Sequence, residues 1–224
     1  MTGSLFASTS PFAPIADEGP FGAILADPPW SYANFSAKGE AKNPNAHYGC
    51  MSLADIAALP VAEIAARDCA LIMWATAPMM PQAFAVMDRW GFRFSTMGAW
   101  AKQSKTGTKW AFGTGYVLRS AAEFWLIGVR GKPRVKVRNT RNLIVAPVRE
   151  HSRKPDEMRA TVERLFDGPY LELFARERAP GWSAWGNETD KFTEPNPSPA
   201  PPPTVTAVTP EASHLPSHSM ISEG

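Results

Sequence analysis

The chain of 224 residues contains little cysteine and no long, uninterrupted apolar run. Its two cysteines, Cys50 and Cys69, are too few for a disulfide framework and lack the spacing of metal ligands, so we expect no metal site. Residues 69–87 carry no charge, but Pro78 and Pro81 interrupt them, which favours a buried strand and a helix over a membrane span. Since no basic, apolar leader begins the chain, we expect a cytoplasmic protein without membrane contact.

Charges of the two signs are distributed unevenly along the chain. The formal net charge is +2, but residues 193–224 contain three acidic residues and no Lys or Arg, so the rest of the chain carries +5. Residues 130–154 alone contain nine basic residues and one acidic residue. Such a concentration of positive charge predicts contact with a polyanion such as nucleic acid.

Composition divides the chain into three parts. Residues 193–224 contain eight of the 22 prolines, and we expect this Pro-rich tail to be disordered. Residues 1–20, rich in Ser, Pro and Ala, are predicted to form a flexible N-terminal segment. Residues 21–192 contain enough apolar side chains for a single folded domain.

Strand and helix patterns alternate within this domain. Apolar runs predict strands over residues 21–26, 69–74, 92–101, 122–129, 143–148 and 170–175. Capping and breaker residues predict helices over 52–59, 81–90 and 155–168. This alternation is typical of a three-layer α/β fold, in which ligands bind beyond the carboxyl ends of the strands.

The first predicted strand ends in Asp27-Pro28-Pro29-Trp30. The prolines remove two amide donors, so the carboxylate of Asp27 and the carbonyl of Pro28 remain as acceptors beside the flat face of Trp30. This set suits adenine, because acceptors on both amino hydrogens would free the nitrogen lone pair to attack a methyl group held in line. Asp27 would stabilise the charge that develops on nitrogen. The alternative is a surface turn with Trp30 in the core.

Residues 130–138 carry a cation at every second position. In an extended backbone these side chains would all point to one side and could contact phosphates, although a solvated edge strand would give the same pattern. The cations are Arg130, Lys132, Arg134, Lys136 and Arg138.

The loop over residues 102–115 adds cations and aromatic residues, among them Lys105, Lys109, Trp110 and Phe112. Two interpretations remain open for this loop. It helps to hold a base that has left its stack, or Trp110 only packs against the protein.

These motifs resemble those of the MT-A70 family of S-adenosylmethionine-dependent adenine N6-methyltransferases, in which Asp-Pro-Pro-Trp is the catalytic signature. The likeness extends from about Phe21 to Asp190, and its further matching stretches are 47–52, 71–74, 100–102, 123–131, 151–157, 171–176 and 186–188. The resemblance implies a Rossmann-like class I methyltransferase fold with permuted motif order, and S-adenosylmethionine as the cofactor.

The resemblance also implies roles for single residues. The catalytic residues would be Asp27, Pro28, Pro29 and Trp30. The resemblance places Tyr48 in a gate loop at the substrate, and Glu123 lies in the matching stretch 123–131. The charge pattern described above, rather than the resemblance, adds the expected substrate contacts Lys105, Lys109, Arg130, Lys132 and Arg134. Residues expected at the cofactor are Asp27, Lys102, Glu172, Arg176, Asn187 and Glu188. Surface cations are the alternative interpretation of Lys102 and Arg176.

The sequence therefore predicts an adenine N6-methyltransferase that acts on nucleic acid. DNA is favoured over RNA because no appended RNA-binding module is visible. The alternatives are a non-catalytic nucleic-acid-binding subunit of a methyltransferase complex, and an enzyme that methylates a small molecule or free nucleotide. The oligomeric state, whether homodimer or complex with a partner subunit, is left open.

Overall fold

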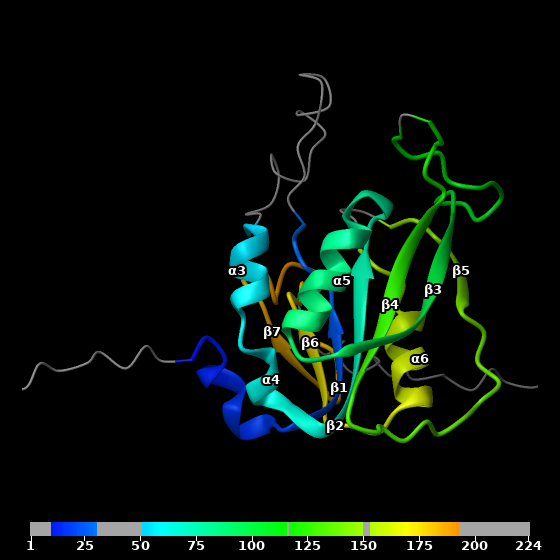
Figure 1. Ribbon diagram of the computed structural model, residues 1–224. Helices are drawn as coiled ribbons and strands as arrows, with labels where there is room; N and C mark the ends of the chain where they lie inside the picture. The colour runs from blue at the N-terminus through cyan, green and yellow to red at the C-terminus, as the bar shows by residue number, and fades with distance from the viewer. Residues whose placement is uncertain (1–9, 31–50, 116, 150–152, 193–224) are drawn as a thin grey trace, which may run out of the picture. The chain divides into compact units, whose positions relative to one another are not determined.

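The structure is a computed structural model that describes residues 10–30, 51–115, 117–149 and 153–192 (Figure 1). The tail predicted to be disordered, 193–224, and the predicted gate-loop residue Tyr48 lie outside the described residues. Within the described part, no helix combines the length and the hydropathy that a membrane span requires.

Seven strands form one mixed sheet in the order β5-β3-β4-β2-β1-β6-β7. Their bounds are Phe21–Ala26 (β1), Ala65–Ala75 (β2), Arg93–Gln103 (β3), Ala122–Arg130 (β4), Leu143–Pro147 (β5), Tyr170–Leu173 (β6) and Trp182–Trp185 (β7). Strand β4 is antiparallel to both of its neighbours, whereas the other pairs are parallel. The start of β4 therefore lies at the same sheet edge as the end of β1. We call this end of the sheet, at which β1 and β2 end and β4 begins, the Asp27 edge.

Helices cover both faces of the sheet (Figure 1). They are Ala13–Glu18 (η1), Leu53–Ala58 (α3), Val61–Ile64 (α4), Ala77–Met79 (η2), Met80–Arg89 (α5) and Glu157–Leu165 (α6). Buried side chains of α3, α4 and α5 belong to one hydrophobic core, and those of α6 to a second core. The predicted mixed α/β class is thus confirmed.

The predicted elements are all present, with ends that differ by a few residues. The Ser52 hydroxyl accepts a hydrogen bond from the Asp55 amide, as the predicted cap requires. After α5, Gly91 adopts a positive φ of 82°, which ends the helix without the strain that a side chain would add. Strand β7 was not predicted, because its four residues, Trp-Ser-Ala-Trp, neither continue an apolar run nor alternate regularly.

The segment before Phe21 differs from the prediction of flexibility where it is described. Its 3-10 helix η1 carries Ile15 into the core, and the preceding Phe12 is also buried. The Phe12 ring packs edge-on against Trp185 at 5.0 Å, and Trp185 Nε1 donates to the carbonyl of Pro11 at 2.8 Å. Two apolar anchors are enough to hold a stretch whose composition alone suggested a loose end.

The basic segment 130–138 is not an extended strand. Strand β4 ends at Arg130, and Gly131, with a φ of 61°, turns the chain so closely past Asp68 that a side chain would not fit. Lys136 Nζ donates to the carbonyls of Glu163 and Phe166 at the end of α6, at 2.8 and 3.4 Å. The alternating cations therefore do not form one row, because some of them stabilise other parts of the fold.

Candidate active site

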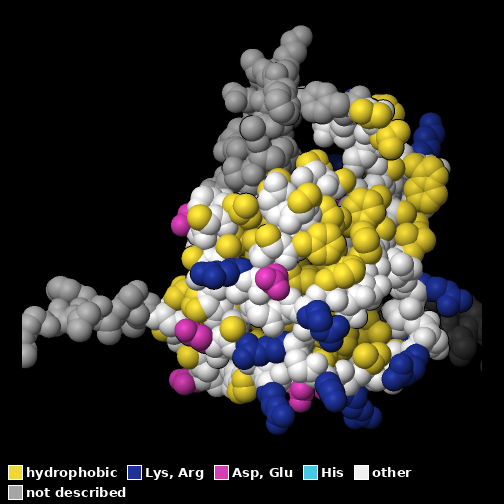
Figure 2. Space-filling view, in the orientation of Figure 1, with side chains coloured by type: hydrophobic (Ala, Val, Ile, Leu, Met, Phe, Trp, Pro, Cys, Tyr) yellow, Lys and Arg dark blue, Asp and Glu magenta, His cyan; other side chains and the backbone are white. Residues whose placement is uncertain are grey.

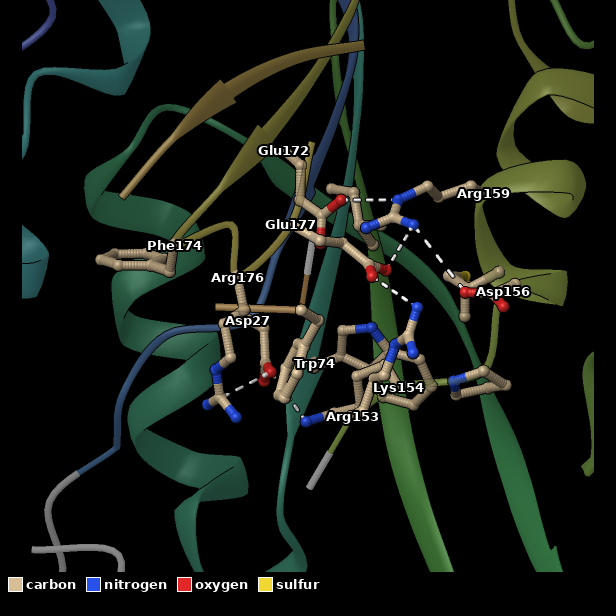
Figure 3. A pocket seen from close by; sticks show the side chains of 14 residues that line it. Asp27, Trp74, Arg153, Lys154, Asp156, Arg159, Glu172, Phe174, Arg176 and Glu177 are labelled. Carbon is tan, nitrogen blue, oxygen red and sulfur yellow. Dashed lines mark hydrogen bonds and ion pairs between the residues drawn. The ribbon is translucent and has the colours of Figure 1, made fainter. Parts of the chain in front are cut away.

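Asp27 directly follows β1, and charged side chains from distant parts of the chain gather around it (Figure 3). Lys154, which precedes α6, places its Nζ 2.8 Å from Asp27 Oδ2 and 3.4 Å from Glu123 Oε2. Arg176 Nη2 lies 3.8 Å from the same Asp27 oxygen, and Lys102 Nζ lies 2.5 Å from Glu123 Oε1. The result is a row of five charges of alternating sign, which we call the charge row.

The charge row is largely withdrawn from water, with side-chain exposures between 16% and 19%. Burial by itself would lower the pKa of Lys154, but the carboxylates of Asp27 and Glu123 outweigh it and raise that pKa. Burial would likewise raise the pKa of Glu123, but Lys154 and Lys102 lower it. Lys154 and Glu123 are therefore both charged at neutral pH, and Lys154 acts as a fixed cation beside Asp27.

A second group of ion pairs lies next to Asp27, and we call it the wall of the site (Figure 3). Arg159 on α6 binds Glu172 on β6 at 2.7 Å and Glu177 at 2.9 Å, and Arg153 binds Glu177 at 2.5 Å. Burial raises the pKa of Glu172, although Arg159 opposes this effect. These bonds fix α6 and the segment after β6 against each other, so the wall is preorganised.

Two cavities meet at Asp27, and both are also lined by Phe174 and Arg176. The first extends along the wall of ion pairs and is lined in addition by Trp74, Lys154, Glu172 and Glu177. The second is lined in addition by Pro29, Met51, Trp185, Asn187 and Glu188. A carboxylate that faces two adjoining cavities can contact two bound molecules at once.

The backbone around the second cavity is tightly held. Phe174 has a φ of 61°, a conformation that costs a non-glycine residue roughly 1 kcal/mol or more. Its ring packs edge-on against Trp185 at 5.6 Å, and the Ala175 amide donates to the Trp185 carbonyl at 3.0 Å. A Cβ on Gly186 would lie 2.8 Å from the carbonyl oxygen of Ala175, so this close approach requires glycine.

The structure places Trp30 in the core rather than beside the cavities. Its side chain is 6% exposed, and its Nε1 donates to the carbonyl of Trp74 at 3.0 Å. The Pro28 carbonyl accepts a hydrogen bond from the Trp30 amide at 2.8 Å. The predicted stacking face is therefore covered, because the indole satisfies its donor and buries its ring inside the protein.

The contacts of Lys102 and Lys154 differ from those expected from the sequence. Lys102 binds Glu123 and does not occur in the described lining of either cavity. Lys154, for which the sequence predicted no role of its own, contacts Asp27 directly. Its position before α6, within the motif at 151–157, was the signal that could have identified it.

The structure does not bring Arg130, Lys132 and Arg134 to Asp27. In the antiparallel pair of β2 and β4, Arg130 lies opposite Cys69 at the other edge of the sheet. Glu123 is seven residues away along β4, a distance of about 23 Å at 3.3 Å per residue. The Arg130 guanidinium donates to the Ala62 carbonyl at 2.7 Å, which is a structural contact.

Replacing Glu123 with glutamine is expected to lower the free energy of unfolding at pH 7 by about 2 kcal/mol, because two largely buried ion pairs lose their shared carboxylate charge. The lowered pKa of Glu123 means that its contribution is present above the ordinary pKa and is lost as the pH falls through the folded value. Urea unfolding at pH 7 and at pH 3 would measure the loss, which should shrink at the lower pH. Asp190→Asn, in an exposed pair with Arg178, should cost less than about 1 kcal/mol. An equal loss at both pH values would contradict this account.

Comparison with known proteins places these features in a family context. The family model MT-A70 matches residues 21–188. A putative N(6)-adenosine-methyltransferase MT-A70-like protein of Medicago truncatula is 33% identical over 174 residues, covering 76% of this chain and 26% of the relative. Type II methyltransferase M.MunI of Mycoplasma sp is 31% identical over 185 residues, covering 74% and 76%. Human N(6)-adenine-specific methyltransferase METTL4 is 30% identical over 187 residues, covering 77% and 38%. The chain thus spans about a quarter of the plant protein.

Proposed function

Because the chain belongs to the MT-A70 family, we propose that it is an adenine N6-methyltransferase that acts on nucleic acid. The observation that carries this proposal is Asp27, a carboxylate at the end of a buried strand that faces two adjoining cavities. Two cavities that meet at one carboxylate suit a transfer between two bound molecules. The sheet, with one antiparallel strand, supports a Rossmann-like class I methyltransferase fold in permuted order.

The residues around Asp27 fit S-adenosylmethionine. Arg176 offers a guanidinium for the carboxylate of the methionine part, and Asn187 and Glu188 offer polar atoms for its remaining groups. Glu172 and Lys154 line the adjoining cavity, whereas Lys102 acts one step away through Glu123. When bound, this cofactor supplies an electrophilic methyl group on a sulfonium sulfur.

The chain's own residues would activate the adenine amino group. Within the described residues, the contacts of the Asp27 carboxylate converge on Oδ2, so Oδ1 is placed to accept a hydrogen bond from the amine. The Pro28 carbonyl, which has a second lone pair beyond its bond to Trp30, is the other acceptor. As the nitrogen formed its bond to the methyl carbon, the carbon–sulfur bond would break and its electron pair would remain on sulfur. Asp27 would stabilise the positive charge on nitrogen, which would then release one proton to water.

DNA is the favoured polymer in this proposal. Among the relatives compared above, the type II methyltransferase is the one whose length the chain largely covers, at 76%, whereas the adenosine methyltransferase of Medicago is covered at 26%. A partner subunit is also compatible with the family, since the zebrafish relative METTL3 is named as a subunit.

Incubation of the purified chain with methyl-labelled S-adenosylmethionine and oligonucleotides of DNA or RNA tests this function. We expect N6-methyladenine in the digested DNA, identified by mass spectrometry, and no label in oligonucleotides that lack adenine. Labelled RNA with unlabelled DNA would move the proposal to RNA. An oligonucleotide that binds without receiving any label would favour the non-catalytic subunit instead.

A further inference from the structure

The connection between β3 and β4 forms a projecting arm at the Asp27 edge (Figure 1). We call residues 104–115 and 117–121 the arm. Its base continues the pairing of the sheet, since the Lys102 amide donates to the Ala121 carbonyl at 2.8 Å and the Ala111 amide to the Lys102 carbonyl at 2.8 Å. Gln103 also forms an antiparallel bridge with Trp110. The arm is therefore an ordered extension of the two strands that carry Lys102 and Glu123.

The arm exposes large apolar side chains to solvent. Trp110 is 63% exposed and Phe112 is 78% exposed, and Leu118 is exposed as well. The guanidinium of Arg119 lies 4.7 Å from the centre of the Phe112 ring. Trp110 does not pack in the interior, which removes the interpretation of this residue as part of the core. Aromatic groups held in solvent on an ordered arm indicate a surface for a ligand.

The charge of the arm identifies the kind of ligand. Its described cations are Lys105, Lys109 and Arg119, and the sequence of residues 104–121 contains no Asp or Glu. Figure 2 shows the hydrophobic and basic side chains together on this part of the surface. Cations for phosphates and aromatic rings for bases are the two components of surfaces that bind single-stranded nucleic acid.

We propose that the arm binds an unpaired nucleic-acid strand, with bases stacked on Trp110 and Phe112 and phosphates near Lys105 and Lys109. This inference rests on the proposed function, and it specifies the substrate as a single strand or a locally opened duplex. In a closed duplex the faces of the bases are stacked on one another and cannot reach the rings. Because the arm continues into Lys102 and Glu123, a strand bound there lies at the same edge as Asp27.

Fluorescence anisotropy with a fluorescein-labelled single-stranded DNA tests the stacking. Trp110→Ala is expected to raise Kd about tenfold, and Trp110→Phe to retain most of the affinity, because a stacked base requires a ring. The matched control is Phe94→Ala, since Phe94 is an aromatic residue, 40% exposed, near the start of β3 at the opposite edge. Unchanged affinity in Trp110→Ala, or an equal loss for closed duplex DNA, overturns the proposal. A change in oligomeric state with unaltered strand affinity overturns it too.

The dependence of Kd on salt tests the phosphate contacts. In single-strand binding each neutralised phosphate contributes about 0.7 to the slope of log K against log salt concentration, so Lys105→Ala with Lys109→Ala should reduce the slope by about 1.4. Arg89→Ala, an exposed cation at the end of α5, should leave it unchanged. An unchanged slope in the lysine variant overturns this part of the proposal.

Measuring methyl transfer in the same samples separates the two proposals. If methyl transfer to nucleic acid occurs while Trp110→Ala binds normally, the arm proposal fails and the proposed function stands. If strand binding depends on Trp110 but no methyl group is transferred to any adenine, the proposed function fails and the arm proposal stands.

Discussion

The variant Asp27→Asn is expected to lower kcat for methyl transfer by a factor of about 10² to 10³, the usual loss when a charge-stabilising group is removed from a preorganised site. Asparagine preserves the shape of the side chain but not its negative charge. The developing cation on nitrogen then lies near Lys154 and Arg176 without the carboxylate that separates it from them. The loss should appear mainly in kcat rather than in KM, because the charge develops only during transfer.

Initial rates at saturating cofactor and oligonucleotide measure this effect, and thermal unfolding checks that the variant is folded. Asp88→Asn is a suitable control, because Asp88 is an exposed carboxylate on α5. Retention of more than a tenth of kcat by Asp27→Asn would contradict the role assigned to the carboxylate. A loss confined to KM would instead assign Asp27 to binding alone.

The position of Asp27 could be predicted from local sequence because two independent signals coincide there. The apolar run of 21–26 predicts a buried strand, and Pro28 and Pro29 cannot continue its hydrogen-bond ladder. The carboxylate must therefore lie at a strand end, where α/β folds bind ligands. The burial of Trp30 could not be inferred in the same way, because its partner, the Trp74 carbonyl, is 44 residues away.

Long-range contacts determine which residues bind Asp27 and which conformation the basic segment 130–138 adopts. Lys154 is 127 residues from Asp27 in the sequence. The number of charges does not show which of the nine cations in residues 130–154 contacts the carboxylate that follows β1. In residues 130–138, alternation predicted a strand, but Gly131 turns the chain and the carbonyl groups at the end of α6 bind Lys136. Both outcomes depend on tertiary contacts, which cannot be read from the local periodicity of the sequence.

Replacing Lys154 with methionine is expected to reduce the free energy of unfolding by about 3 kcal/mol, because two largely buried carboxylates lose the cation between them. Glu123 keeps Lys102, and Asp27 keeps Arg176 at the longer distance of 3.8 Å, so the protein should still fold. Lys154→Arg retains the charge and should lose much less stability. Urea unfolding at pH 7 measures the difference between the two variants.

The same variant is expected to shift the pH dependence of methyl transfer. In the native protein Lys154 helps to lower the pKa of Glu123, so its removal allows that pKa to rise. Glu123 is then protonated at a higher pH than in the native protein. The acid limb of the plot of kcat against pH should therefore shift to higher pH in Lys154→Met but not in Lys154→Arg. A purely structural role for Lys154 would lower stability without moving this limb. An acid limb that coincides in all three proteins would therefore show that the charge row does not set the protonation state of the site.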